Sequence, residues 1–137
     1  MGLDDARVQG FLATKEIAVL ATVQADGAPL ATPMWFLHAP AALTMISVAD
    51  TQKVRNLRRD PRVSVVAEAV AGAGEVRGLT VQGRAEFLSD GPERRALVER
   101  FHEKYRGLER LWAGKAMPAN RVMFRIVPSR VRSWGLG

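Results

Sequence analysis

The segment SVADTQKVRNLRRDPR, residues 47–62, combines a predicted strand end, a helix start and a helix stop. Thr51 is a residue type that caps helices, and the Asp-Pro pair at 60–61 ends them, so a short helix is expected in between. A helix start exposes backbone N–H groups and the positive end of the helix dipole, which favour anions. Lys53 lies in this first turn, where the dipole disfavours a cation. A bound anion would explain the lysine, and we therefore predict a phosphate site that includes Ser47, Thr51 and Lys53.

On both sides of this segment, the chain is divided into short runs rich in β-branched residues. The expected strands span residues 17–23, 29–37, 43–48, 62–70, 75–88, 121–127 and 130–134. The Asp-Gly pair at 26–27 and the glycine-rich run at 71–74 predict hairpin turns. Pro33 indicates an edge or a bulge in the second strand, and Gly83 indicates a bulge in the fifth. Short strands joined by hairpins predict a closed antiparallel barrel of six or seven strands.

Two further helices are expected to flank this barrel. Asp4 is expected to cap the first one, whose apolar face carries Val8 and Phe11. The second begins near Pro92 and runs to about residue 106, and a loop follows at 111–120. The apolar residues, 47% of the chain, are spread along it, so we expect a single domain of mainly β class across residues 1–137.

Composition excludes several kinds of site. The chain has no cysteine, which removes disulfides, thiolate metal sites and cysteine nucleophiles, and it has only two histidines.

No apolar run approaches the roughly 20 residues that a membrane span needs, and the first residues show no signal-peptide pattern, so a cytoplasmic protein is expected. The net charge of +6 indicates either an anionic partner or solubility alone.

The sequence shows no recognisable group of residues for nucleophilic catalysis. No Ser-His-Asp set with a nucleophile turn is present, and the glycines at 72–78 have the wrong spacing for a dinucleotide-binding loop. Arg58 and Arg59 lie near the predicted helix end, where the dipole favours cations, so the helix alone explains them. Trp35 is either a packing residue of the core or of a dimer, or a residue that faces a cofactor.

Four segments, residues 17–36, 47–65, 79–87 and 121–134, resemble the pyridoxamine 5′-phosphate oxidase-like split β-barrel superfamily. Within it they are most similar to the flavin/deazaflavin oxidoreductase group that uses coenzyme F420. The most specific part is TQKVRNLRRDPR at 51–62. The resemblance implies a split β-barrel with flanking helices and a homodimer with its cofactors at the subunit interface.

The resemblance also implies roles for individual residues. A strand-end hydroxyl and a helix start hold the cofactor phosphate in this family, roles that fall on Ser47, Thr51, Gln52 and Lys53. The strand expected to line the ring system, largely through its backbone, carries Ala31, Thr32, Pro33, Met34 and Trp35. The F420 cofactor also carries an oligoglutamate tail, whose candidate contacts are Arg55, Arg58 and Arg59.

The implied function is hydride transfer between F420 and a small organic substrate, in which the cofactor performs the difficult step. FMN is the alternative cofactor. Flavin-binding members commonly have a basic residue just before the lysine, where this chain has Gln52, which favours the deazaflavin. The C-terminal pattern that holds pyridoxamine phosphate is absent after Val131, so that reaction is not expected.

Two hypotheses of another class stay open. One is a carrier that binds the cofactor without a reaction of its own. The other is a basic barrel that binds nucleic acid, although such barrels display aromatic stacking residues and this chain has a single tyrosine. We therefore expect a small-molecule partner and a second copy of the chain, and neither nucleic acid nor a membrane span.

Overall fold

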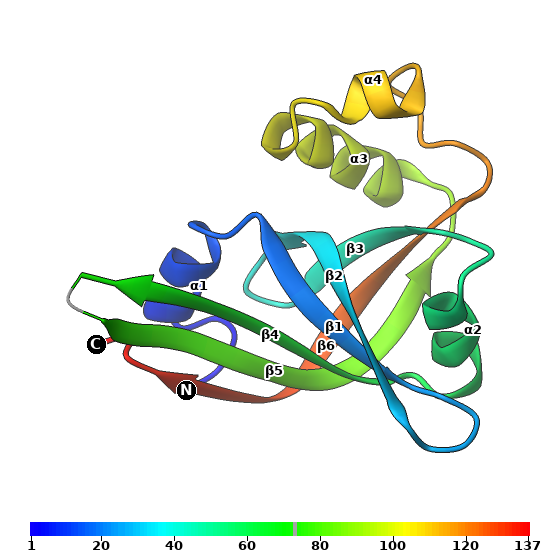
Figure 1. The fold of residues 1–137 in the computed structure, drawn as a ribbon. Coiled ribbons are helices and arrows are strands. Elements are labelled where there is room, and N and C mark those ends of the chain that lie inside the picture. Colours follow the sequence, from blue (N-terminus) through cyan, green and yellow to red (C-terminus); the bar gives the residue numbers. More distant parts are fainter. Residues whose placement is uncertain (73) are drawn as a thin grey trace.

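Six antiparallel strands close into a barrel in the computed structural model, which describes residues 1–72 and 74–137 (Figure 1). Their order around the barrel is β1-β2-β3-β6-β5-β4. The strands are β1 (Ile17–Val23), β2 (Pro29–His38), β3 (Leu43–Val48), β4 (Arg62–Ala71), β5 (Glu75–Leu88) and β6 (Arg121–Trp134). The helices of the described residues are α1 (Ala6–Leu12), α2 (Gln52–Arg59), α3 (Pro92–Lys104) and α4 (Leu108–Trp112). The predicted mainly β class, with a closed antiparallel barrel and flanking helices, is confirmed.

Alternation along the strands places the main core inside the barrel. In β1, Ala18 and Leu20 are fully buried while Ile17 is exposed, as expected for a strand with one face inward. A second apolar cluster, which includes Phe101 and Leu108, attaches α3 and α4 to the barrel wall. Burying one such side chain contributes roughly 1.5–3 kcal/mol, so this cluster holds the pair of helices, hereafter the α3–α4 arm, against the barrel.

Each residue of β2 pairs with a neighbouring strand on one side only. Residues 29–35 pair with β1, whereas only residues 36–38 pair with β3. The stretch 31–35 therefore has one backbone edge that pairs with no strand of the described chain. Pro33, which has no N–H to donate, lies in this stretch, and its predicted edge position is confirmed.

Three predicted boundaries differ from the structure for local reasons. Asp5, not Asp4, caps α1, because its carboxylate accepts the backbone N–H of Arg7 at 2.8 Å. The two predicted C-terminal strands are one strand, β6, since Pro128 is accommodated opposite Gly83 at a shift in register. α3 ends at Lys104, earlier than expected, and a further helix, α4, begins at Leu108 and ends at Trp112, inside the predicted loop.

The two glycine-rich features are partly confirmed. The bulge predicted at Gly83 is present, and a Cβ there would collide with a backbone oxygen of β6. The predicted hairpin at 71–74 joins β4 to β5, and its residue 73 lies outside the described residues.

Among the helices that the structure describes, none has the length and apolar character to cross a bilayer.

Candidate functional site

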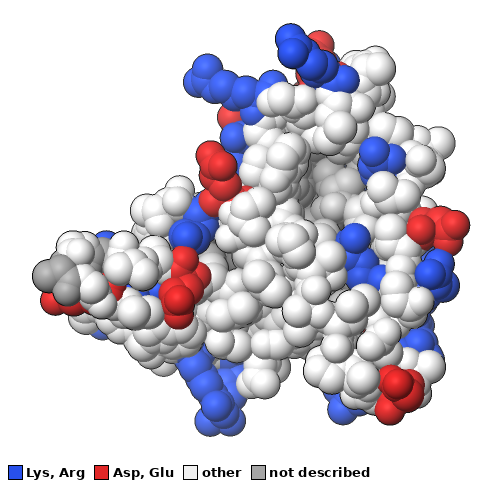
Figure 2. All heavy atoms as spheres, in the orientation of Figure 1, with Lys and Arg blue, Asp and Glu red and all other residues white. Residues whose placement is uncertain are grey.

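The α3–α4 arm, β2, β3, the beginning of β6 and the first turn of α2 surround a cleft of about 300 Å³, hereafter the α2 cleft. Figure 2 shows the surface hollowed below the arm, on the side of α2. Its apolar side is formed by Pro33, Met34, Trp35, Ile46, Val48, Phe101, Leu108, Leu111 and Trp112. Its polar side is formed by Ser47, Lys53 and Arg121. The cleft therefore brings part of the predicted phosphate site together with part of the predicted ring-lining strand.

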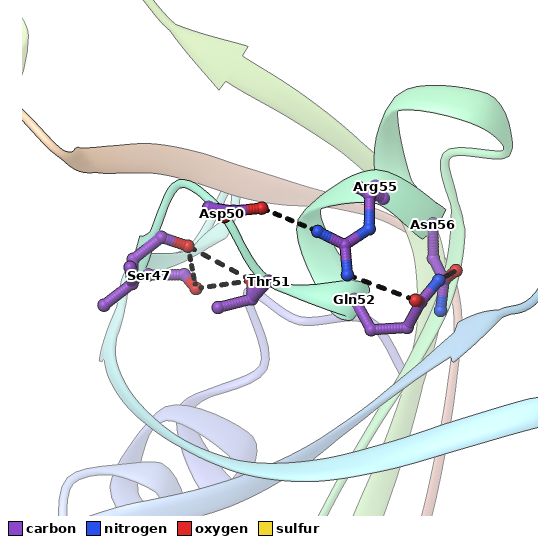
Figure 3. A network of polar contacts seen from close by, with 7 residues as sticks. Ser47, Asp50, Thr51, Gln52, Arg55 and Asn56 are labelled. Atoms are coloured by element: carbon purple, nitrogen blue, oxygen red, sulfur yellow. Dashed lines mark hydrogen bonds and ion pairs between the residues drawn. The ribbon is translucent and has the colours of Figure 1, made fainter.

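Ser47 and Thr51 direct their hydroxyls at the same backbone carbonyl (Figure 3). Ser47 Oγ donates to the Val48 carbonyl at 3.0 Å, and Thr51 Oγ1 donates to it at 3.1 Å. The two hydroxyl oxygens are 3.4 Å apart. Thr51 occupies the predicted N-cap position, but its side chain makes no capping hydrogen bond to α2. The first N–H groups of α2 can therefore donate to a ligand.

Lys53 is half-buried in this cleft. Burial lowers the pKa of its ammonium below the ordinary 10.5, and no carboxylate of the described residues counteracts that effect. None of the residues that line the cleft is Asp or Glu. A desolvated cation without a counter-charge is unfavourable, so the site suits an anion. Two hydroxyls, a helix start and one ammonium are a donor set that fits a phosphate.

The side chain of Gln52 is engaged along α2 (Figure 3). Its Nε2 donates to Asn56 Oδ1 at 2.8 Å, and its Oε1 accepts from Arg55 Nη2 at 3.3 Å. Asn56 is fully buried and donates to Thr22 Oγ1 in β1 at 3.0 Å. These bonds anchor α2 to the barrel. They also leave the backbone N–H as the group that Gln52 offers to a ligand at the helix start.

The three arginines of α2 have partners in the protein, and none of them lines the α2 cleft. Arg55 pairs with Asp50 at 2.7 Å. The Arg58 guanidinium lies 4.1 Å from the ring centre of Phe87, and Arg59 donates to a backbone carbonyl at the end of β1. Arg58 and Arg59 thus contact the barrel, which the helix end alone did not predict.

The five predicted residues of β2 divide into two groups. Pro33, Met34 and Trp35 line the cleft, whereas Ala31 and Thr32 lie beyond it along the unpaired edge. The side chain of Met34 belongs to the core. Thr32 Oγ1 is buried and has no hydrogen-bond partner among the described residues.

Trp35 is 38% exposed and is not a core residue. Its ring stacks on Tyr105, with centroids 4.4 Å apart and planes inclined by 3°. The Tyr105 hydroxyl accepts the Phe36 N–H at 2.8 Å and donates to the Glu16 carbonyl at 2.7 Å. Burial raises the pKa of Tyr105 to about 12, so the hydroxyl stays protonated. Trp35 is therefore held in a fixed orientation at the wall of the cleft.

The sequence did not identify the part of the cleft that comes from the second half of the chain. The residues concerned are Phe101, Leu108, Leu111, Trp112 and Arg121. Helical spacing at Phe101 and Leu108 predicted an apolar face, but it could not show what that face covers. Arg121 carried no local signal beyond its place at the start of a strand.

A larger hollow of about 790 Å³ lies along α3, hereafter the arm hollow. Its charged lining residues are Arg94, Arg95, Arg106, Lys115, Asp90, Glu99, Glu103 and Glu109. Asp90 Oδ1 lies 3.6 Å from Arg94 Nη2 and 3.4 Å from Arg95 Nη1. The positive and negative side chains that line the arm hollow compensate one another, as on a solvated helix face. In the described part of the chain, no cluster of three or more His, Cys, Asp or Glu side chains could bind a metal ion.

Comparison with known proteins relates this fold and cleft to one family. The family model described as pyridoxamine 5′-phosphate oxidase matches residues 4–135. A conserved hypothetical protein from Mycobacterium tuberculosis is 30% identical, with a TM-score of 0.81 over 96% of this chain and 84% of that one. An FAD-binding protein from Mesorhizobium loti is 25% identical, with a TM-score of 0.74 over 89% of this chain and 84% of that one.

A protein that is described as a haem storage protein has a similar fold. The haem storage protein HutZ from Vibrio cholerae is 19% identical, with a TM-score of 0.78 over 96% of this chain and 94% of that one. At this identity the likeness shows the fold alone. Function therefore has to be argued from the cleft.

Proposed function

The chain belongs to the pyridoxamine 5′-phosphate oxidase family, and from that premise we propose that it transfers a hydride between coenzyme F420 and a small organic substrate. The observation that carries the proposal is half-buried Lys53, which lies beside Ser47 in a cleft with an apolar wall and has no counter-charge among the described residues that line it. A phosphate joined to a flat ring system needs this combination. The cleft provides the charge and donors at one end and an apolar surface at the other.

The phosphate end would use four neighbouring residues. The hydroxyls of Ser47 and Thr51, which now donate to the Val48 carbonyl, would turn to the phosphate oxygens. The backbone N–H of Gln52 and the ammonium of Lys53 would complete the set. An anion between these donors also raises the pKa of Lys53 again and keeps it charged.

The ring end would use the edge of β2 and the aromatic wall. Backbone groups of residues 31–35 and the ring of Trp35 would orient the ring system, and the α3–α4 arm would exclude water from one side. When bound, F420 supplies the hydride chemistry, so the protein needs no nucleophile. Arg55 is the best placed of the three arginines for an acidic tail, because its ion pair with Asp50 is exposed and such pairs are weak.

A second copy of the chain would complete this site. Ala31 and Thr32 lie on an unpaired strand edge, and Leu111 beside the cleft is 65% exposed. Edges and apolar residues of this kind are usually covered. We therefore include a homodimer in the proposal, and size-exclusion chromatography with light scattering tests it.

FMN remains the second candidate. A relative at 25% identity is named as FAD-binding, and FAD and FMN carry the same flavin ring. The deciding experiment is a set of three separate titrations, with F420, FMN and FAD, followed by ligand fluorescence. Micromolar or tighter binding of F420, with FMN and FAD at least tenfold weaker, is the expected result. Preference for FMN, with a yellow protein on purification, would replace F420 by FMN at the same site.

Two outcomes would overturn the proposal. Binding of F420 without any hydride exchange across a panel of small organic acceptors would identify a carrier. Failure to bind all three ligands, with salt-dependent retention of a single-stranded oligonucleotide, would favour a basic barrel that binds nucleic acid.

A further inference from the structure

Arg121 lies beside the phosphate end of the α2 cleft because of the register between β3 and β6. Val48 pairs with Arg121, and Ser47 pairs with the next residue of β6. The Ala49 N–H donates to the Asn120 carbonyl at 2.8 Å, which ties the start of β6 to the loop before α2. The carbonyl of Val48 is the one that accepts both the Ser47 and the Thr51 hydroxyl.

The charge of Arg121 is oriented but not neutralised. Within residues 1–72 and 74–137, its guanidinium makes one hydrogen bond, from Nη1 to Asn120 Oδ1 at 2.7 Å. It belongs to no ion pair there, whereas arginines elsewhere, such as Arg62 and Arg125, have carboxylates at 2.7 and 2.8 Å. Arg121 is partly buried and shares the lining of the cleft with Lys53, and no carboxylate lines it. Two cations in one cleft repel each other until an anion separates them.

We propose that Arg121 is a second anion-binding residue of the α2 cleft, which recognises a negative charge additional to the one that Lys53 holds. The inference rests on the proposed function and names the ligand class more closely. The additional charge is either the second negative charge of a terminal phosphomonoester or a carboxylate attached to the ligand beyond its phosphate. The guanidinium of arginine fits either group, since both offer two neighbouring oxygens to its two parallel N–H donors.

The test compares Arg121→Ala and Arg121→Lys with wild type, and uses Arg130→Ala as the matched control. Arg130 is an exposed residue of the same strand, outside the cleft. Each protein is titrated with F420, with FMN and with riboflavin, which is FMN without its phosphate. Arg121→Ala should weaken the anionic ligands about tenfold and Arg121→Lys about threefold, because Lys keeps the charge but loses the fork.

The ligand that loses more identifies the source of the charge. A larger loss for FMN points to the phosphomonoester, and a larger loss for F420 points to a neighbouring carboxylate. Riboflavin affinity and the affinities of Arg130→Ala should stay within twofold of wild type. Equal losses for riboflavin and FMN, or losses below twofold for both anionic ligands, would overturn the inference.

A separate measurement uses inorganic pyrophosphate and thermal unfolding, and it needs no ring binding. Pyrophosphate should raise the Tm of wild type and of Arg130→Ala more than that of Arg121→Ala. Equal shifts in all three proteins, or no shift in wild type, would overturn the role of Arg121. If none of the ring-bearing ligands binds wild type, the proposed function fails, and this measurement alone decides the inference about Arg121.

Discussion

Two concave regions of this protein, the arm hollow and the α2 cleft, differ both in size and in how far their charges are compensated. The arm hollow, at about 790 Å³, is more than twice the volume of the α2 cleft, at about 300 Å³. Yet Asp90 already lies near two arginines in the hollow, whereas Lys53 and Arg121 share the cleft without a carboxylate. Because an isolated, partly buried charge is unfavourable, the smaller region is the one that we propose as the ligand site.

The largest difference between the two regions is expected from one lysine in each. Lys53→Ala removes the uncompensated charge of the cleft and should weaken cofactor binding about 100-fold, the loss typical of a truncated partner in a desolvated charge pair. Lys115→Ala removes an exposed charge from the arm hollow and should leave affinity within twofold. Ligand fluorescence titration measures both. Equal affinities for the two variants would remove the distinction between the regions.

The second expected difference is in stability. Asn56→Leu removes a fully buried amide and leaves the buried hydroxyl of Thr22 without its partner, which should cost about 2 kcal/mol of unfolding free energy. Asp90→Asn breaks only exposed ion pairs of the arm hollow and should cost less than about 0.5 kcal/mol. Urea denaturation of both variants checks this. A cost for Asn56→Leu as small as that for Asp90→Asn would show that α2 is not anchored through this network.

The aromatic wall of the cleft gives the third expected effect. Trp35→Leu removes the ring that Tyr105 holds in place and should weaken ligand binding about tenfold, within the range for stacking on an aromatic side chain. Trp134→Leu changes a tryptophan outside the cleft and should not alter affinity. The quenching of tryptophan fluorescence by bound ligand should also decrease in the first variant alone. Identical quenching in both would place the ring system elsewhere.

The smallest expected effect is a pH dependence of binding. Burial lowers the pKa of Lys53, so its neutral form appears at lower pH than for a lysine with the ordinary value of 10.5. Only the ammonium attracts an anion, so affinity should fall as pH rises through the lowered pKa, and the fall should begin at a lower pH than for a lysine with the ordinary value.

Lys53→Arg provides the control for that effect, because a guanidinium stays charged across this range. The ratio of wild-type to Lys53→Arg affinity removes any titration of the ligand itself. A ratio that does not change with pH would show that Lys53 does not titrate in the range measured.

The sequence predicted the barrel well because its signals are local. The alternation and β-branched residues of 17–23 and 43–48 match β1 and β3 to the residue, and Pro33 correctly indicated an edge. Register between distant strands has no local signal. The pairing of Val48 with Arg121 therefore could not be foreseen, nor could the closure of the cleft by the α3–α4 arm.

The candidate site was predicted in part for the same reason. Ser47 and Lys53 lie within one short segment, and the structure places both in the cleft. The direction of a side chain depends on neighbours that the sequence does not reveal. Gln52 bonds to Asn56 instead of facing the cleft, and Arg58 lies on the ring of Phe87.

The pairing of β3 with β6 also determines when the cleft exists during folding. Its polar side needs Val48 and Arg121 to meet, and these residues are far apart along the chain. Contacts of such long range form late, because a large loop must close first. A ligand that needs both sides of the cleft would bind only after the barrel has closed. It should therefore slow unfolding and leave the refolding rate unchanged, so that the bound protein lives longer without forming any faster.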